Sequence, residues 1–213
     1  QIRSSAASDV YKRQILMLAF LVAAFNQFSG INAFLYYAPR IFEAGGIGQS
    51  AALLNSVGIG LTNVIFTYIG ISLIDKLGRK SLMYIGSIGY IISLTLISLS
   101  FILDWGGILL PIFLFLFIAS HAIGQGAIIW VYISEIFPNN IRSYGQSFGV
   151  STHWVLAAII PSLIPFLFSW IGPGIVFVFF AFMMVLQLLF THFVMPETKG
   201  VSLEDLSKKL IKN

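Results

Sequence analysis

Hydrophobic residues run along this chain in long unbroken stretches, separated by short polar segments. Six stretches can be marked off, each 22 to 27 residues long, against the roughly 20 helical residues that cross a bilayer core. They are Ile15 to Tyr37, Ala51 to Ile74, Ser81 to Leu103, Ile108 to Ser134, Ser147 to Trp170 and Gly174 to Met195. Strands of a membrane barrel would alternate over about 10 residues, so the unbroken runs predict helices. We expect an all-α membrane protein with six transmembrane helices.

The basic residues between the stretches predict the orientation. Of the 12 Lys and Arg residues, only Arg40 falls on one side. The other side carries Arg3, Lys12, Arg13, Lys76, Arg79, Lys80, Arg142, Lys199, Lys208, Lys209 and Lys212. Because cytoplasmic loops are enriched in Lys and Arg, both termini are expected in the cytoplasm and residues 38–50 outside. The pattern predicts a multi-pass protein of the cell membrane, and we expect a bacterial one.

Composition agrees with a membrane protein. The chain is 58% hydrophobic and 9% charged, with a mean hydropathy of +0.92, whereas about 25% of residues are charged in soluble domains. The net charge of +4 comes from the loop residues just named, which anionic lipid headgroups explain, so no nucleic-acid partner is expected. Cysteine is absent, which excludes disulfides, thiolate nucleophiles and cysteine metal sites.

The two ends differ from the spans. Residues 1–14, QIRSSAASDVYKRQ, are small, polar and charged and lack a secretory signal pattern. We interpret them as non-native sequence, such as a truncation junction, a cloning remnant or an assembly artefact; the alternative is a cytoplasmic linker. Residues 15–195 form the six-span domain and residues 196–213 a cytoplasmic tail. In the tail, Leu203, Leu206 and Leu210 have the spacing of an amphipathic helix.

Residues Asn26 to Tyr37, NQFSGINAFLYY, place three amides and two tyrosine hydroxyls in the first stretch. An unpaired amide in an apolar medium costs roughly 2 to 7 kcal/mol, so these groups need a polar cavity or ligand. At about 100° per residue, Gln27 and Asn32 point some 140° apart on a straight helix. We therefore expect a bend at Ser29-Gly30, as in the discontinuous helices of transporter sites. Alternatively the amides join helices, at about 0.6 kcal/mol per bond; their density favours a substrate pathway.

Small and polar residues form a stripe along the second stretch. They are Ser56, Gly60, Asn63, Thr67 and Gly70, at spacings of three and four residues, which place them on one helix face. Most of the stripe favours close helix packing. Asn63 is the exception, because it is the only amide of the stripe and lies in mid-span.

Several motifs together resemble the sugar porter family of the major facilitator superfamily. They are NQFSGINAFLYY, GLTN twelve residues before DKLGRK, GAIIWVYISEIFPNNIR with Gly126, Trp130, Glu135 and Arg142, and PETKG after the last span. Their order matches the carboxyl-terminal six-helix half of that family from about Ile15 onward. The resemblance implies a twelve-span protein whose sugar site lies between two six-helix domains near mid-membrane. The amino-terminal six-helix domain is then a missing partner.

The resemblance also implies roles for individual residues. Gln27 and Asn32 would bind sugar hydroxyls together with Asn63 and Trp130, and Asn26 and Tyr36 also belong to the expected binding set. The family uses the positions of Tyr36 and Tyr37 to occlude the site; the alternative is an ordinary aromatic belt. Gly30 and Tyr37 are expected to serve the outer gate. Amides suit this task, because each offers a donor and an acceptor, as a hydroxyl does. The indole of Trp130 offers an N–H and an apolar face. No Asp, Glu, Lys or Arg occurs in the six stretches, which suits a neutral ligand.

Three positions depart from the family pattern. Asn26 stands where a glutamine is common, so its reach is one methylene shorter. Residues Gly124 to Ile129 replace a proline-rich stretch, so the fourth helix is expected either to unwind less or to hinge on glycine instead, with Gln125 as a further polar contact. His153, before Trp154, stands where an amide is common; both residues are expected at the sugar site, and the histidine can take a proton near its reference pKa of about 6.5.

The remaining histidines and the charged residues complete the picture. His121, His153 and His192 lie on separate spans without ligand spacing, so no metal or other cofactor is expected. Charged groups gather at the cytoplasmic ends of the spans, where the family uses such groups in ion pairs between domains that close the inner gate. The gating set is Asp75, Gly78, Arg79, Glu135, Arg142 and Glu197, with Gly30 and Tyr37 on the outer side. The alternative is a solvated set of loop charges, worth 0 to about 1 kcal/mol per pair.

We interpret the chain as half of a monosaccharide transporter that works by alternating access and performs no covalent chemistry. The alternative is a membrane sugar sensor that does not transport, or an inactive half-transporter fragment. An enzyme is excluded, because the sequence offers no paired catalytic carboxylates and no nucleophile with its base. In the family, the titrating carboxylate of proton-coupled members lies in the other domain, so uniport and proton symport of a hexose or a pentose both fit these residues.

Overall fold

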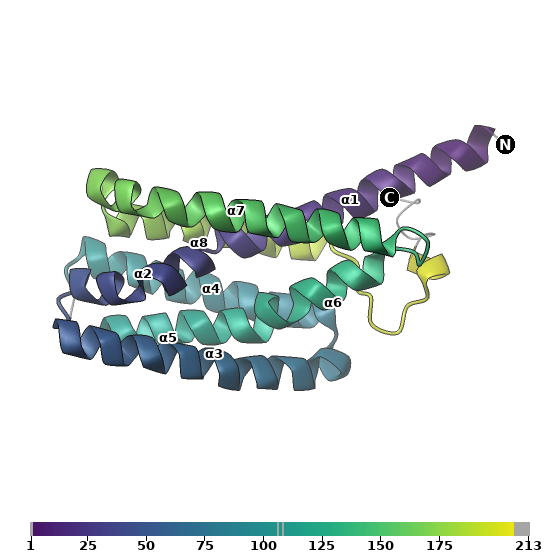
Figure 1. Cartoon of the computed structure of the whole chain (residues 1–213). Coiled ribbons are helices and arrows are strands. Elements are labelled where there is room, and N and C mark those ends of the chain that lie inside the picture. The colour runs from purple at the N-terminus through teal and green to yellow at the C-terminus, as the bar shows by residue number, and fades with distance from the viewer. Residues whose placement is uncertain (1, 106, 108, 207–213) are drawn as a thin grey trace.

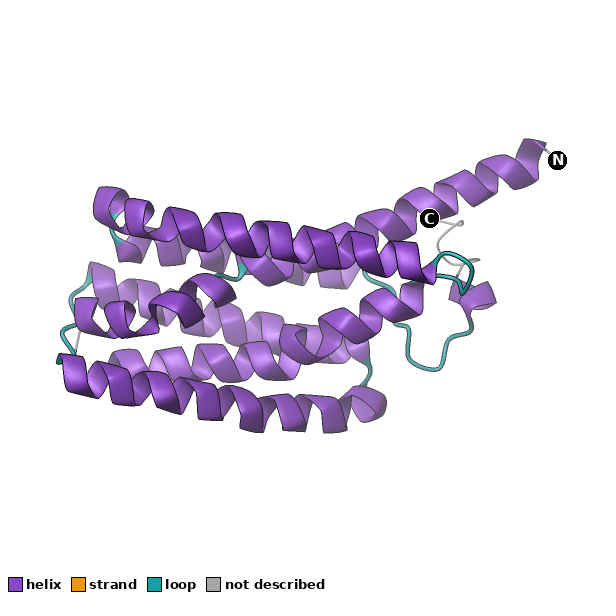
Figure 2. Cartoon of the chain, viewed as in Figure 1, coloured by secondary structure: helices purple, strands orange, loops and turns teal. Residues whose placement is uncertain are grey.

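The computed structural model describes residues 2–206 except 106 and 108, with side chains from residue 10 onward. Long helices lie alongside one another in a bundle, and the start of α1 projects beyond it (Figure 1). The described residues form helices joined by short loops, and no strand occurs among them (Figure 2). The helices are α1 Ile2–Phe28, α2 Ile31–Ala44, α3 Gln49–Leu77, α4 Arg79–Ile102, α5 Leu109–His121, η1 Ala122–Gly126, α6 Ala127–Ile136, α7 Arg142–Ile171 and α8 Pro173–Phe193.

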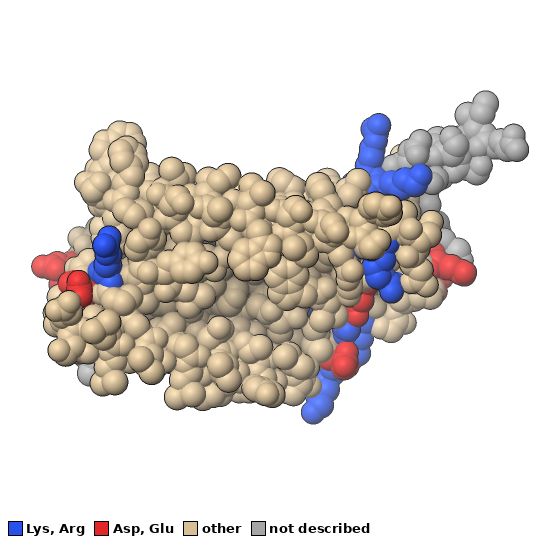
Figure 3. All heavy atoms as spheres, in the orientation of Figure 1, with Lys and Arg blue, Asp and Glu red and all other residues tan. Residues whose placement is uncertain are grey.

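Six helical segments among the described residues are long and apolar enough to cross a membrane, which confirms the predicted fold class. They are Val10–Ala44, Gln49–Leu77, Arg79–Ile102, Leu109–Ile136, Arg142–Ile171 and Pro173–Phe193. The first combines α1 with α2, and the fourth combines α5, η1 and α6. Most spans extend a few residues beyond the predicted bounds, because a helix does not end where its sequence stops being apolar. Charged side chains cluster at the two ends of the visible face, leaving a wide uncharged band between them (Figure 3).

The predicted boundary at residue 15 is not a break in the chain's conformation. Helix α1 continues through it from Ile2, and Tyr11 and Ile15 are already buried against the bundle. At the other end, residues 203–206 are helical and Leu206 is buried. The expected contribution of Leu210 lies outside the described residues.

Packing is closest in the half of the bundle built on α4. This helix packs along α8 and α5, while α1 packs along α7. Ser98 donates to the carbonyl of Gly174 across the α4–α8 contact at 2.9 Å. By contrast, α3 and α7 bury few of their residues, so their outer faces are free to meet lipid or another helical domain.

Candidate functional site

The first span breaks where the sequence predicted. Helix α1 ends at Phe28, and Gly30 has φ 82° and ψ 10° before α2 begins, a left-handed conformation that favours glycine. A Cβ on Gly30 would lie 2.5 Å from the ring of Phe180, so the site needs glycine for space as well. The Ser29 hydroxyl donates to the Asn26 carbonyl at 2.6 Å, which satisfies a group that the break frees. The prediction of a bend at Ser29-Gly30 is confirmed.

The break brings the amides of the first span together. Asn32 Nδ2 donates to Gln27 Oε1 at 2.9 Å, and Gln27 Nε2 donates to Asn26 Oδ1 at 2.9 Å. Gln27 Nε2 also contacts His153 on α7, at 3.2 Å from Nδ1 and 3.3 Å from Nε2. Asn26, Gln27 and His153 are buried, and Asn32 is half-buried. The three amides are hydrogen-bonded to one another. A ligand that binds here must therefore replace some of these hydrogen bonds with its own.

Two tryptophans border this amide cluster. The ring centroid of His153 lies 4.9 Å from that of Trp130 on α6 and 5.1 Å from that of Trp154, both edge-on. The two indoles are 41% and 57% exposed, so they present aromatic surface beside buried amides. Apolar faces next to hydrogen-bonding groups match the two kinds of surface that a sugar ring offers.

Three predicted residues do not join the cluster. Asn63 lies half-buried on α3, and within the described residues its amide makes no hydrogen bond. Tyr36 is 62% exposed on α2, and the ring centroid of Tyr37 lies 6.0 Å from the Arg40 guanidinium carbon. Their roles in binding and occlusion remain predictions.

Of the two alternatives for the fourth span, the structure shows the hinge on glycine. Its π-helical turn η1 contains Gly124 with the non-helical angles φ −84° and ψ −105°. A Cβ on Gly124 would lie 2.8 Å from the Cα of Gly86 on α4, so two glycine backbones touch at the hinge. The carbonyl of Ala122 likewise would lie 2.9 Å from a Cβ on Gly70, which assigns this member of the α3 stripe to packing.

Gln125 faces the bundle interior instead of the amide cluster. Its Nε2 donates to Gln187 Oε1 on α8, and Gln187 Nε2 donates to the Ser87 hydroxyl on α4 at 2.7 Å. Gln125 Oε1 is buried without a hydrogen-bond partner in the described structure. Sequence reasoning missed Gln187, although it is the only amide in the sixth stretch.

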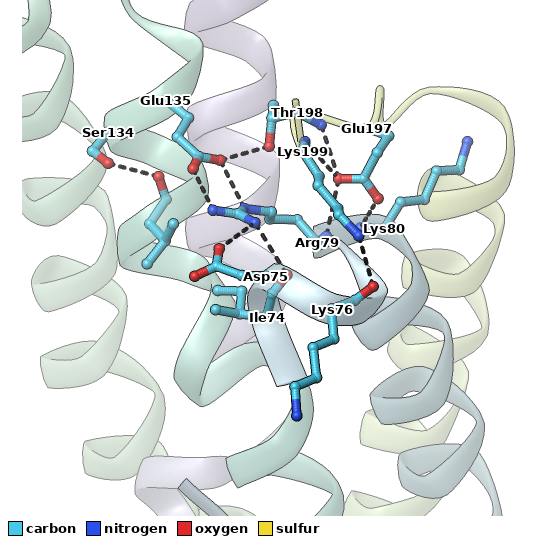
Figure 4. Close-up of polar contacts among 11 residues, drawn as sticks. Ile74, Asp75, Lys76, Arg79, Lys80, Ser134, Glu135, Glu197, Thr198 and Lys199 are labelled. Atoms are coloured by element: carbon cyan, nitrogen blue, oxygen red, sulfur yellow. Dashed lines mark hydrogen bonds and ion pairs between the residues drawn. The ribbon is translucent and has the colours of Figure 1, made fainter. Parts of the chain in front are cut away.

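A second polar cluster closes the end of the bundle where most basic side chains lie (Figure 4). The Arg79 guanidinium donates to both oxygens of Glu135, at 3.0 Å from Nε and 2.6 Å from Nη2. Arg79 Nη1 donates to Asp75 and to the Ile74 carbonyl, each at 3.1 Å. Arg79 is buried, so this fork ties α3, α4 and α6 together more tightly than a surface pair would.

Glu197, after the last span, caps the first residues of α4. Its carboxylate accepts from the backbone N–H groups of Arg79 and Lys80, each at 3.0 Å, and from those of Thr198 and Lys199. Burial works to raise the pKa of Glu197, but the backbone hydrogen bonds from Lys199, Arg79, Lys80 and Thr198 outweigh it and lower the pKa. A carboxylate at a helix N-terminus also complements the helix dipole.

The tight turn before this cap requires glycine. Gly78 has φ 88°, and a Cβ there would lie 2.5 Å from Glu197 Oε2. Thr198, which sequence reasoning missed, donates its hydroxyl to Glu135 Oε2 at 2.6 Å and joins the two carboxylates. Arg142 lies apart: its Nε donates to the Phe137 carbonyl at 3.3 Å, and it forms no ion pair within the described residues.

The other histidines have aromatic partners. His121 is hydrogen-bonded to the Tyr90 hydroxyl, and His192 to the Tyr84 hydroxyl at 2.7 Å. In the part of the chain that the structure describes, no group of three or more His, Cys, Asp or Glu residues is placed to hold a metal ion.

Comparison with known proteins identifies relatives over nearly the whole chain. The family model described as sugar (and other) transporter matches residues 3–210. The arabinose-proton symporter of Bacillus subtilis (strain 168) is 38% identical over 201 residues, which are 94% of this chain and 43% of the relative. The D-xylose transporter of Levilactobacillus brevis is 35% identical over 217 aligned positions, which cover 99% of this chain and 48% of the relative.

Solved structures show the same similarity. The structure of XylE, a proton:xylose symporter of the major facilitator superfamily, bound to 6-bromo-6-deoxy-D-glucose, is 32% identical in sequence with a TM-score of 0.82. The match covers 92% of this chain and 42% of that one. The chain thus spans about half the length of the relatives it matches.

Proposed function

Because the chain belongs to the sugar (and other) transporter family of the major facilitator superfamily, we propose that it is the carboxyl-terminal half of a transporter that carries a monosaccharide across the membrane. The single observation that carries this proposal is the cluster of two buried amides, Asn26 and Gln27, with the half-buried Asn32 at the break between α1 and α2. Buried amides without ionised groups suit a neutral, hydroxyl-rich ligand. The relatives named above are transporters of arabinose and xylose by name, which supports a pentose as the substrate. A further relative, the glucose transporter GlcP of Staphylococcus epidermidis, supports a hexose.

The proposed site uses the amide cluster for hydroxyl groups and Trp130 and Trp154 for the apolar face of the sugar. His153 supplies a further hydrogen-bonding group, and Asn63, Tyr36 and Tyr37 approach only when the complete protein closes around the sugar. No residue of this half performs covalent chemistry. The second six-helix domain of the complete protein supplies the other wall of the site.

Alternating access requires contacts that exist in one conformation and break in the other. We propose that the inner gate closes against the polar cluster at the basic end of the bundle, which consists of Asp75, Gly78, Arg79, Glu135 and Glu197. Arg142 is proposed to form an ion pair across the domain interface. The hydrogen bonds of Arg79 support this role. They run to Glu135 on α6 and to Asp75 and the Ile74 carbonyl on α3, so they fix the ends of three helices as one unit. The end of the bundle that holds this fork is proposed to face the cytoplasm.

We propose that the complete protein couples sugar transport to the movement of an ion. Two relatives are sugar-proton symporters by name, from Bacillus subtilis and Escherichia coli, which supports the proton as the coupling ion. The proposed location is the bacterial cell membrane, with lipid around the bundle.

The test is sugar uptake by the complete protein in cells that lack their own uptake system. We expect saturable uptake of labelled D-xylose, L-arabinose or D-glucose. Gln27→Ala and Asn32→Ala should each weaken sugar binding at least several-fold, since each lost hydrogen bond is worth about 1 kcal/mol or more. The matched control is Asn55→Ala on α3, because its exposed side chain bonds only the Ala51 carbonyl one turn earlier.

Two results would overturn the assignment. Unchanged affinity of correctly folded Gln27→Ala and Asn32→Ala proteins would reject the amide cluster as the site. Sugar binding without any uptake by the complete wild-type protein would favour a sensor over a transporter.

A further inference from the structure

The first and fourth spans are both bent, and a tyrosine on a straight helix lies between the bends. The first span breaks at Ser29-Gly30, and the fourth hinges at the π-helical turn η1. Helix α4 runs unbroken from Arg79 to Ile102 and packs along α8. Its Tyr90 has no exposed surface. A buried phenol needs a hydrogen-bond partner, and Tyr90 finds one at the hinge of the fourth span.

The partner is His121, the last residue of α5. The hydroxyl of Tyr90 is hydrogen-bonded to its Nδ1. The imidazole also lies over η1, since a Cβ on Gly126 would be 3.1 Å from its Nε2. A phenol hydroxyl donates as well as accepts, so this bond forms with either tautomer of a neutral imidazole. Tyr90 therefore holds a side chain that stands at the start of the hinge and contacts its end.

The ring of Tyr90 reaches the other bent span through Phe117 on α5. The centroids of these two rings lie 5.4 Å apart, and the centroid of Phe34 lies 5.4 Å from that of Phe117. All three rings are buried. Phe34 is in the first turn of α2, where its N–H donates to the Gly30 carbonyl at 2.8 Å. The Ser29 side chain also lies close enough to Tyr90 to hydrogen-bond with it.

We propose that Tyr90 is a positioning residue for transport, which couples the break of the first span to the hinge of the fourth. The proposal rests on the function proposed above. In that function α2 carries the tyrosines of the outer gate, and α6, which follows the hinge, carries Trp130 of the sugar site and Glu135 of the inner gate. A residue of a straight helix that contacts both bends transmits a change at one bend to the other, because packed helices shift between discrete arrangements.

Tyr90→Phe isolates the hydroxyl. The variant keeps the ring and its packing against Phe117 but loses the hydrogen bond to His121. We expect the turnover of sugar transport to fall at least about fivefold, the lower end of typical coupling between two sites. Sugar affinity should change by less than about twofold, since Tyr90 makes no hydrogen bond to an amide side chain in the described structure.

The experiment compares uptake with binding. The purified complete protein is reconstituted into lipid vesicles, and uptake of labelled D-xylose, L-arabinose and D-glucose gives the turnover per folded molecule. Equilibrium binding of the same sugars gives the affinity and shows that each variant is folded. A merely structural role for Tyr90 would lower the thermal unfolding temperature but leave the turnover per folded molecule unchanged.

Tyr132→Phe on α6 is the matched control. Tyr132 is as fully buried as Tyr90, but its hydroxyl has no hydrogen-bond partner in the described structure. Its removal should leave the turnover at the wild-type value. Equal slowing of transport by Tyr132→Phe and Tyr90→Phe would contradict a specific role for Tyr90.

Substitutions of His121 test the route of the coupling. His121→Leu removes the same hydrogen bond from the other side, so it should slow transport as Tyr90→Phe does, and it carries the test if Tyr90→Phe does not fold. The protein with both substitutions should be no slower than the one with either, because both remove one interaction. His121→Gln keeps a side chain that can bond the phenol and should restore much of the turnover.

The outcomes separate the two proposals. Wild-type turnover in folded Tyr90→Phe, or effects of Tyr90→Phe and His121→Leu that multiply in the double variant, would overturn the coupling and leave the proposed function intact. Failure of the wild-type protein to take up any of the three sugars would overturn the proposed function, and the coupling with it.

Discussion

Gly30 determines the geometry of the candidate site through its backbone and through its missing side chain. The positive φ of 82° ends α1, and the hydrogen atom in place of a Cβ lets Phe180 pack against the break. Gln27 and Asn32 can hydrogen-bond only because the chain changes direction between them. The same residue therefore sets both the fold of the first span and the order of the amides.

Replacing Gly30 with alanine should destabilise the protein. The left-handed conformation costs a residue with a Cβ roughly 1–2 kcal/mol, and the added methyl group would collide with the Phe180 ring at 2.5 Å. We expect a lower thermal unfolding temperature and weaker sugar binding in the purified complete protein.

Gly60→Ala on α3 is the matched control, since nothing lies within 4 Å of the position that its Cβ would take. It should keep the wild-type unfolding temperature. Equal unfolding temperatures for the wild-type protein and Gly30→Ala would contradict the requirement for glycine.

For single residues, the sequence predicted structure correctly where a residue type is rare in its surroundings, as an amide or a glycine is within an apolar span. Three amides within seven residues and a glycine between Gln27 and Asn32 predicted the bend, because a straight helix could not unite those side chains. It failed for Gln187 and Thr198, whose partners come from α4, η1 and α6. The partner of a lone amide in an apolar helix, or of a threonine in a tail, lies far away in the sequence. It can be identified only from the packed structure.

Among the elements, α4 is held by contacts with other helices at its middle and by a carboxylate cap at its start. In the middle, Ser87 receives the hydrogen bond from Gln187 and Gly86 touches the Gly124 hinge. Gln125, in the segment that replaces the proline-rich stretch implied by the resemblance, donates to Gln187 on α8. We infer that this pair holds the hinge of the fourth span against α8.

At the start of α4, the Glu197 carboxylate should contribute stability that depends on pH. Its pKa is lowered from an ordinary value of 4.5, so the contribution is present above that value and is lost as the pH falls through the lower folded-state pKa. Glu197→Gln should lower the thermal unfolding temperature near neutral pH. The difference from the wild-type protein should shrink as the pH falls below 4.5.

Glu204→Gln supplies the control for the loss of one negative charge, because this exposed side chain makes no hydrogen bond in the described structure. It should unfold at the wild-type temperature. A Glu197→Gln protein whose deficit stays constant from neutral to acidic pH would argue against a charged cap.

Hydropathy predicts the spans but not the residues at which the helices begin. The apolar stretches located all six spans, yet α1 begins at Ile2 and α7 at Arg142, outside those stretches. Polar residues continue a helix once its apolar part has formed, because each added residue gains a backbone hydrogen bond. The change in composition at residue 15 marks the edge of the apolar stretch rather than the end of a helix.

For the whole molecule, charge asymmetry predicts the orientation in the membrane. The described half has no cysteine, so single cysteines placed in it can be labelled selectively once any in the other half are replaced. Gly48→Cys, in the loop between α2 and α3, should react in intact cells with a maleimide that cannot cross membranes. Asn140→Cys, in the exposed loop between α6 and α7, should react only after permeabilisation.

The reverse labelling pattern would show that the basic end of the bundle faces outward. Labelling of both positions in intact cells would instead indicate leaking cells. Ser202→Cys, on the same side as Asn140, checks this, because it too should require permeabilisation.

The cap on α4 also bears on how the protein is made. Glu197 lies 118 residues after Arg79, whose backbone N–H it accepts, and it follows the sixth span. Since a chain is synthesised from its amino terminus, the start of α4 leaves the ribosome long before its partner exists. This end of the bundle can therefore close only around a chain in which all six of these spans have been translated.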